Sequence, residues 1–303
     1  MLAIIEITRA TRRALACAGA PRANPWRPVV LMVCAVMCFP LMQTCVKLLV
    51  GDHAMHFLQV TWGRYFFHLL LVPLFFPSSL RLLGHTRRPL IQLTRGLMLF
   101  IGTAAAFLAV KYMAIPEMTA ISFVAPIVVT LLAAVFLRER VSWQRWLAVV
   151  AGFIGVLIIV QPQRDLGWPV VLPLVMACCY AVYQVLTRVM RNDATAGVSL
   201  FYTALIGAVL GSIIAPFVWQ WPDGVQWALL VGAAFFGALG HFLMIQAYEL
   251  GEASFIAPFA YAELLAASFA GLLFFGDLIG PNTALGALVI AGAGWYVARS
   301  ART

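Results

Sequence analysis

Apolar residues fall into long runs along this chain, and short polar links separate the runs. A membrane-spanning helix needs about 20 mostly apolar residues. Ten runs are long enough: 28–50, 57–77, 90–113, 117–137, 143–161, 169–190, 196–219, 226–248, 253–275 and 282–298. The links are rich in Gly, Pro, Asp and Arg, residue types that interrupt helices. The pattern predicts an all-α membrane protein of ten transmembrane helices with no separate soluble domain.

The second half of the chain repeats the layout of the first. Residues 109–160 hold two apolar segments joined by a short charged link, and residues 247–295 hold two more with the same spacing. The acids that close the first segment of each copy, Glu139 and Asp277, are as far apart in the chain as the alanines that open the copies, and we call this separation the repeat offset. An odd number of helices in each repeat makes the second copy start on the far side of the membrane. We therefore expect two inverted five-helix repeats, an arrangement typical of secondary transporters.

Each copy has the same order of features. A small residue and a short linker precede an apolar helix with a central proline or acid. A link that contains Arg-Glu in the first copy and Gly-Asp in the second leads to a glycine-bearing helix. This order resembles the paired EamA-type domains of the drug/metabolite transporter superfamily, over about residues 28 to 298. The second copy departs from the pattern, because Leu264 stands where the first has Pro126 and Asp277 replaces the usual glutamate. The resemblance implies four parts: a cytoplasmic tail 1–27, the repeats 28–161 and 162–298, and a cytoplasmic tail 299–303.

The composition supports a membrane location. Hydrophobic residues make up 63% of the chain and charged residues 10%, and the mean hydropathy is +0.96. Because a soluble domain carries about 25% charged residues, this chain has more apolar surface than a soluble fold can bury. The net charge of +9 does not indicate nucleic acid, since nearly all arginines flank apolar segments. The expected partners are membrane lipid and a small-molecule solute, with no nucleic acid, and we expect a monomer.

Lysine and arginine are distributed unevenly between the two sets of links. In membrane proteins these residues accumulate on the cytoplasmic side. Sixteen of the 20 lysines and arginines lie in the two tails, in the even-numbered links and at adjoining helix ends, including Arg95 and Arg188. The opposite links hold only Arg164. This distribution predicts a multi-pass protein of the bacterial inner membrane with both termini in the cytoplasm.

Polar side chains inside the apolar segments are the candidates for solute binding, because a bilayer makes them costly unless they serve a site. Helical spacing puts Gln43 and Lys47 on one face of the first segment. The same spacing puts Arg64 and His68 on one face of the second segment. The candidate binding residues are Gln43, Lys47, Trp62, Tyr65, His68, Tyr180, Tyr183, His241, Tyr248, Tyr261 and Glu263.

Structural interpretations compete with these functional ones. Lys47 lies near the outer end of its segment, where its amine can extend to the membrane interface. Several aromatic candidates suit an interfacial belt, and the two histidines suit structural hydrogen bonds. Glu263 falls near the middle of its segment, too far from the interface to reach it, so a functional role is favoured. Pro126 and Pro258 are hinge candidates, because proline removes a backbone hydrogen bond within a helix.

Together these features predict a secondary transporter that exports small organic metabolites by alternating access around a central cavity. Within the superfamily the chain is similar to bacterial exporters of aromatic amino acids and related metabolites, which favours amino acids as solutes. A membrane enzyme acting on lipid and a channel are the alternatives. The sequence has no HExxH, GxSxG or ATP-binding motif, and its six cysteines match no zinc spacing. We therefore predict no catalytic residue, no metal and no cofactor.

Overall fold

The computed structural model describes residues 26–75, 88–112, 118, 121–139, 141–160, 167–193, 195–275 and 281–300. Throughout these residues the regular elements are helices, and none is a strand. The first half contains α2 (Trp26–Lys47), the π-helical η1 (Leu48–Asp52), α3 (Phe57–Phe75), α5 (Pro89–Ala109), α7 (Ala125–Phe136) and α8 (Trp143–Val160). The second half contains η2 (Trp168–Val170), α9 (Val171–Val189), η3 (Met190–Asn192), α10 (Ala196–Ile214), η4 (Ala215–Val218), α11 (Gly224–Leu250), α12 (Ala253–Ile256), η5 (Ala257–Tyr261), α13 (Ala262–Phe275) and α14 (Pro281–Ser300). Most of the N-terminal tail, Arg164 and Asp277 lie outside the described residues.

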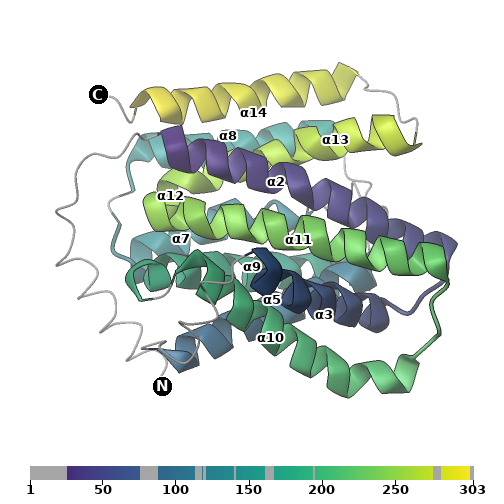
Figure 1. The fold of residues 1–303 in the computed structure, drawn as a ribbon. Helices are drawn as coiled ribbons and strands as arrows, with labels where there is room; N and C mark the ends of the chain where they lie inside the picture. Colours follow the sequence, from purple (N-terminus) through teal and green to yellow (C-terminus); the bar gives the residue numbers. More distant parts are fainter. Residues whose placement is uncertain are drawn as a thin grey trace.

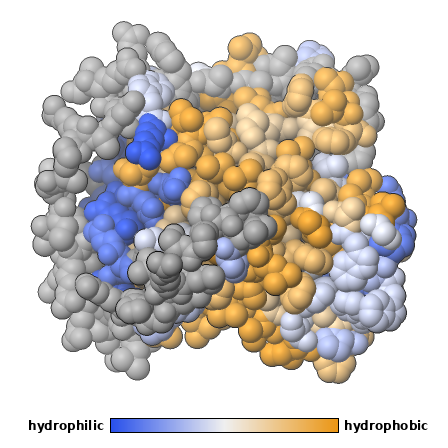
Figure 2. Space-filling model, viewed as in Figure 1, coloured by the Kyte–Doolittle hydropathy of each residue, from blue (hydrophilic) through white to orange (hydrophobic). Residues whose placement is uncertain are grey.

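Six segments of the described chain are long and apolar enough to cross a membrane. They are Trp26–Asp52, Pro89–Ala109, Trp168–Asn192, Ala196–Val218, Gly224–Leu250 and Ala257–Phe274. Figure 2 shows an apolar band across the visible face of the molecule, with more polar surface at its two ends. The protein is therefore a multi-pass membrane protein, while the crossing of the membrane by all ten predicted segments stays a prediction.

The packing of the helices repeats between the two halves (Figure 1). When α2, α3, α5, α7 and α8 are matched in order with α9, α10, α11, α13 and α14, the main contacts between the halves have equivalents. The helix α2 packs on α11 as α9 packs on α5, and α2 packs on α13 as α9 packs on α7. The helix α3 packs on its own counterpart α10, and α8 packs on α14. The start of α2 and the end of α14 lie at the same end of the bundle (Figure 1).

Equivalent glycines allow two of these crossings to be close. Gly102 of α5 and Gly240 of α11 occupy equivalent positions, because the repeat offset separates them in the chain. A Cβ atom on Gly240 would lie 2.7 Å from the ring of Phe39 and 3.1 Å from the carbonyl oxygen of Ala35. A Cβ atom on Gly102 would lie 3.3 Å from the Cβ of Cys179. Small residues let helix backbones approach closely in a membrane, so these glycines set the distance between the halves.

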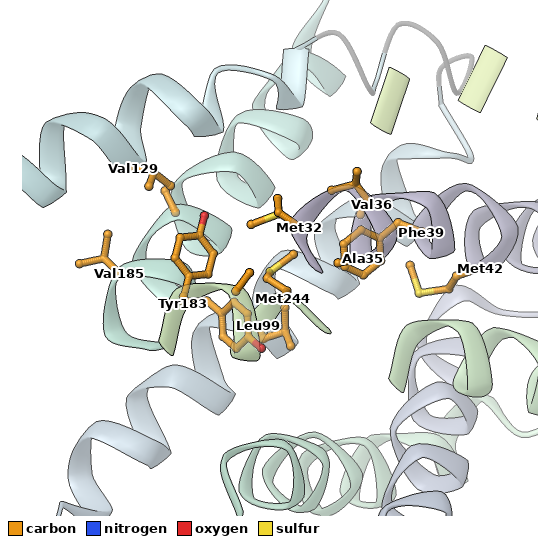
Figure 3. Close-up of a cluster of buried hydrophobic side chains, with 14 of the residues drawn as sticks. Met32, Ala35, Val36, Phe39, Met42, Leu99, Val129, Tyr183, Val185 and Met244 are labelled. Carbon is orange, nitrogen blue, oxygen red and sulfur yellow. The ribbon is translucent and has the colours of Figure 1, made fainter. Parts of the chain in front are cut away.

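Apolar side chains from both halves fill the middle of the bundle. The buried cluster includes residues of four helices: Phe39, Met42, Leu99, Tyr183 and Met244. Figure 3 shows these side chains between their helices. Methionine is unbranched and adapts to irregular or changing gaps more easily than leucine or isoleucine. The core therefore contains side chains that tolerate a change in the distance between helices.

Two helices are interrupted within the bundle. The predicted segment 253–275 is not one continuous α-helix but α12, the 3₁₀ segment η5 and α13. Pro258 in η5 has no backbone N–H to donate, which explains the interruption. In the first half α7 begins only at Ala125, with Pro126 in its first turn. Glu263 lies in the first turn of α13, and the repeat offset separates it from Ala125, the first residue of α7. The helices that begin after the two interruptions therefore start within one residue of equivalent positions of the two repeats.

Two arginines that the sequence assigns to the cytoplasmic links are buried instead. Arg95 is 0% exposed, and its guanidinium donates to Oγ1 of Thr187 at 3.4 Å and to Oγ1 of Thr203 at 2.7 Å. Arg188 is 9% exposed and donates to the carbonyl oxygen of Tyr248 at 2.9 Å. Both guanidinium groups donate to acceptors on neighbouring helices, which offsets part of the cost of burying a charge, while Nε of Arg95 has no hydrogen-bond partner among the described residues. The charge distribution along the sequence counts these two arginines toward the cytoplasmic side, and the structure adds that both side chains are buried in the bundle.

Candidate functional site

A cavity of about 60 Å³ lies where the two halves meet. Residues of α2, α3 and α5 from the first half line it together with residues of α9, α11 and α13 from the second. Its polar lining residues are Gln43, Arg64, Thr103, Tyr180, His241 and Glu263. The other lining residues are apolar, and four of them are methionines: Met42, Met98, Met118 and Met176. A few polar groups in an apolar wall are the usual composition of a small-molecule site.

A second hollow of about 40 Å³ adjoins the first. Gln43, Tyr180 and Glu263 line both hollows. The second hollow also reaches Pro126 at the start of α7 and Gln184 on α9. Because one water needs roughly 10–15 Å³ of such volume, the two hollows together hold only a handful of waters. An organic solute therefore enters only if the surrounding helices separate.

Arg64 of α3 is a buried cation at this centre, with 1% of its surface exposed. Its Nη1 donates to Oγ1 of Thr103 at 2.8 Å, and its Nη2 donates to Nε2 of His241 at 2.7 Å. The repeat offset separates Thr103 from His241, so the two partners occupy equivalent positions in the two halves. The guanidinium also lies 4.8 Å from the ring centre of Tyr65, within cation–π range. Arg64 thus connects α3 to both α5 and α11.

Glu263 lies on the opposite half of the molecule from Arg64, in α13. The side-chain amide of Gln43 donates to its Oε1 at 3.3 Å. Glu263 occupies the first turn of α13, directly after the 3₁₀ segment η5. Within the described residues, no lysine or arginine forms an ion pair with it. The carboxyl group is therefore available to a cationic ligand or to a proton.

Aromatic rings form one wall of the cavity. Tyr180 and Tyr183 of α9 are stacked, with ring centres 6.0 Å apart and 14° between the ring planes. The ring of His241 lies 5.1 Å from that of Phe39 and 5.5 Å from that of Tyr183, between centres. Phe39, Tyr180 and His241 line the cavity, whereas Tyr183 is fully buried behind them. Such rings offer a planar solute group a surface on which to stack.

The structure brings some of the sequence-based candidates together and separates others. The candidates that line the cavity are Gln43, Tyr180, His241 and Glu263. Two further candidates are buried next to this lining: the hydroxyl of Tyr65 lies 3.0 Å from Oγ1 of Thr103, and Tyr183 stacks on Tyr180. Of the hinge candidates, Pro126 lines the second hollow and Pro258 lies in the interruption before α13.

Three aromatic candidates lie away from the central cavity and have partners of their own. Trp62 donates its indole N–H to Oγ of Ser212 at 3.0 Å, on the side where α3 meets α10. Tyr248 donates its hydroxyl to the side-chain oxygen of Gln184. Tyr261 donates to a backbone carbonyl of α8 at 3.1 Å. These contacts join neighbouring helices, and a role of the three residues in solute binding stays a prediction.

Lys47 and His68 also lie outside the cavity lining. Lys47 is the last residue of α2, and its side chain is partly exposed, as an amine that extends to the interface should be. His68 is 0% exposed and lies one helical turn after Arg64. Neither ring nitrogen of His68 has a hydrogen-bond partner among the described residues.

Arg64 and Thr103 are site residues that the sequence-based candidates do not include. The sequence places Arg64 on one face with His68, but the partners that fix a buried cation come from α5 and α11. The repeat offers one usable signal, since a shift by the repeat offset aligns Thr103 with the candidate His241. A residue-by-residue match of the two copies therefore indicates Thr103, whereas it gives no signal for Arg64.

Residues 26–161 and 167–298 each match the EamA-like transporter family. The chain belongs to this family. The match confirms the resemblance drawn from the repeated layout, and it identifies this EamA-like protein as a membrane transporter rather than an enzyme. The family is a two-repeat membrane fold, which agrees with the equivalent contacts in the two halves.

Relatives of this EamA-like protein are named as transporters of small molecules. The chain is 29% identical over 245 residues to the S-adenosylmethionine uptake transporter of Rickettsia felis, covering 80% of this chain and 83% of that protein. It is 32% identical over 173 residues to the riboflavin transporter of Vibrio cholerae, covering 56% of this chain and 58% of that protein. A solved crystal structure has the same fold, with a TM-score of 0.78 and 16% identity over 92% of this chain and 99% of that chain. The protein is therefore a small-molecule transporter, and its place among exporters of aromatic amino acids stays a prediction.

Proposed function

We propose that this EamA-like protein moves S-adenosylmethionine, or as a second candidate an aromatic amino acid, across the bacterial inner membrane by alternating access. The observation that carries the proposal is the central cavity, which equivalent helices of both halves line: α2 with α9, and α5 with α11. Transporters built from inverted repeats hold their solute between the repeats, near the midplane. The cavity is formed within one chain, which favours a monomer.

Alternating access explains the small volume of the cavity. At about 60 Å³ the cavity is too small for an organic solute, so the solute-bound state requires the halves to move apart. The interruptions before α7 and α13 provide places where half-helices can tilt, and both border the second hollow. With ten crossings in two inverted repeats, equivalent contacts of the two halves would break in turn. The cavity would then open first to one side of the membrane and afterwards to the other.

The chemistry of the wall supports a solute with a planar ring. S-Adenosylmethionine joins an adenine ring to an amino acid through a sulfonium group, and the relative from Rickettsia felis is named for its uptake. Phe39, Tyr180 and His241 offer the ring a stacking surface, and the lining methionines offer a polarisable apolar wall. The same surface suits an aromatic amino acid, which is the class that the sequence predicts. We propose uptake for the first solute and export for the second.

Counterflow in proteoliposomes tests this function. Vesicles loaded with unlabelled S-adenosylmethionine should accumulate labelled S-adenosylmethionine faster than empty vesicles, and the rate should saturate. Parallel vesicles loaded with phenylalanine test the second candidate. A channel would show neither saturation nor counterflow, and an enzyme would change the solute covalently. Counterflow with riboflavin alone would contradict both proposed solutes while leaving a transporter of small molecules.

Reporter fusions test the proposed topology. Fusions at Asp52 and Asp223 should report the periplasm, and fusions at Asn192 and at Gly84, which lies outside the described residues, should report the cytoplasm. This pattern follows from ten crossings with both termini in the cytoplasm. An odd number of crossings would contradict the inverted repeat.

A further inference from the structure

We infer that the central cavity recognises a zwitterion, with Arg64 binding its carboxylate and Glu263 binding its positively charged group. The inference rests on the proposed function and deepens it by naming the charge pattern of the solute. It follows from three properties of the described lining: a buried cation without an acid, a carboxyl group without a cation, and an otherwise uncharged wall.

Arg64 has no acidic partner within the described residues. A guanidinium has five N–H donors, and Thr103 and His241 accept only two hydrogen bonds from it. Its Nε in particular is buried without a hydrogen-bond partner among those residues. Burying a charge without an opposite charge carries a large desolvation penalty, which a solute carboxylate would offset through a charge-assisted, bidentate hydrogen bond. Arg64 is therefore the anion-binding group of the cavity.

His241 adds no second positive charge to this site. Arginine can only donate, so Nε2 of His241 must accept the hydrogen bond from Arg64. The ring then carries its proton on Nδ1 and is neutral. His241 and Thr103 hold the guanidinium from two helices, which fixes its direction before the solute arrives. The described lining thus contains one fixed positive charge.

Glu263 supplies the acidic group that can pair with a cationic group of the solute. Arg64 and Glu263 line the same cavity, yet they form no ion pair with each other at 4.0 Å or less. The two side chains belong to helices of different halves, so neither uses up the binding capacity of the other. The side chains of Arg64 in α3 and Glu263 in α13 come from different halves, and the space between them is the cavity. A solute with an anionic and a cationic group bridges that space and completes both pairs.

The cation that meets the carboxylate is therefore Arg64 rather than the sequence-based candidate Lys47. Lys47 ends α2 and does not line the cavity. Amino acids and S-adenosylmethionine share the required charge pattern, because each carries a carboxylate and a cationic centre. Riboflavin carries neither charged group in its ordinary form.

A binding experiment with single-charge analogues tests the inference. The full chain in lipid nanodiscs is titrated with phenylalanine, with phenethylamine, which lacks the carboxylate, and with 3-phenylpropionate, which lacks the amine. We expect each analogue to bind the wild type about 10- to 100-fold more weakly than phenylalanine, as loss of a charged hydrogen bond predicts. S-Adenosylmethionine is titrated alongside and should compete with phenylalanine for the same site.

Variants that remove one charge show which residue binds the carboxylate of the solute and which binds its amine. Arg64→Gln should bind phenylalanine and phenethylamine equally, and Glu263→Gln should bind phenylalanine and 3-phenylpropionate equally. Arg64→Lys, which keeps the charge, should restore part of the preference for the carboxylate. Arg191→Gln removes a cation from η3, away from the cavity, and serves as the matched control.

Two results would overturn the inference. One is an unchanged ratio between phenylalanine and phenethylamine in a folded Arg64→Gln protein, judged by size-exclusion chromatography and thermal unfolding. The other is a wild type that binds riboflavin but neither zwitterion. Binding of phenylalanine with the expected ratios but without counterflow would instead contradict the proposed function and leave the recognition of a zwitterion intact.

Discussion

Charged groups are arranged in opposite ways at the centre of the molecule and at one end of the bundle. At the centre, Arg64 and Glu263 share a cavity without pairing. At the end, two ion pairs join four residues that we call the link cluster: Glu139 of the α7–α8 link, Arg145 at the start of α8, Arg188 at the end of α9 and Glu252 of the α11–α12 link. Arg145 Nη1 lies 2.6 Å from Glu252 Oε2, and Arg188 Nε lies 3.8 Å from Glu139 Oε1.

The difference suggests two uses of charge in one membrane protein. Both pairs of the link cluster join residues of the first half to residues of the second, so they connect the two halves at that end of the bundle. Glu139 also accepts a hydrogen bond from the backbone N–H of Ala253 at 3.2 Å, which strengthens the same connection. Arg64 and Glu263 form no ion pair among the described residues, so a solute can provide the ion-pair partner of each. We expect central variants to change solute recognition and cluster variants to change the conformational equilibrium.

The largest effect is expected for Arg64→Gln. Glutamine keeps a donor for Thr103 or His241 but loses the charge, so the transition to a solute-bound state loses a buried charged hydrogen bond of about 1.5–3 kcal/mol. The initial rate of counterflow should fall about 10- to 100-fold at a fixed, subsaturating solute concentration. Substitution of Lys47 by Gln should lower the rate much less. Equal losses in the two variants would return the anion-binding role to Lys47.

Glu263→Gln is expected to have the next largest effect. Glutamine keeps the size of the side chain and an oxygen that accepts from Gln43, so the fold should persist. Removing the charge should lower the rate of counterflow about tenfold, since the cationic end of the solute loses its partner. The measurement is the same proteoliposome assay, with insertion checked by the amount of reconstituted protein. A rate close to that of the wild type would give Glu263 a packing role.

The sequence predicts the helices of this protein better than it predicts the contacts of the site. Long apolar runs follow from the thickness of the bilayer, so their positions are local properties of the chain. The interruption at Pro258 is also local, because a missing N–H acts on its own helix. The hydrogen bonds of Arg64 depend instead on how α3, α5 and α11 pack, which no single segment of the sequence contains.

The burial of two arginines also could not be predicted from the sequence alone. Arg95 and Arg188 lie near helix ends in the sequence, and that position alone suggests an aqueous link. Their partners come from other helices, with Thr203 of α10 accepting from Arg95 and the end of α11 accepting from Arg188. Such partners are 60 or more residues away in the chain, so only the folded arrangement identifies them.

Within the link cluster, Glu139→Gln should have the larger effect. The side chains of Glu139 and Arg188 are each only 10% exposed, so solvent screens their attraction weakly. Loss of the Glu139 charge should favour separation of the halves at this end by about 1 kcal/mol. This corresponds to a roughly fivefold change in the equilibrium between the separated and the joined arrangement. The test is the rate at which a thiol reagent labels Ser122→Cys, a residue of the second hollow, in a protein without its native cysteines. Faster labelling from this end with unchanged solute selectivity is the expected result, whereas altered selectivity would contradict the separation of roles.

The smallest effect is expected for Glu252→Gln, although its ion pair is the shorter one. The side chain of Glu252 is 50% exposed and that of Arg145 is 20% exposed, so water and salt screen the pair. Exposed pairs contribute about 0.2–1 kcal/mol, which corresponds to less than about a fivefold change in the equilibrium. Labelling of Ser122→Cys should therefore change less than in Glu139→Gln, and the difference should shrink further as salt is added. If Glu252→Gln opened this end more than Glu139→Gln, the exposed pair would be the main closure, and burial would not decide which contact of the link cluster holds the halves together.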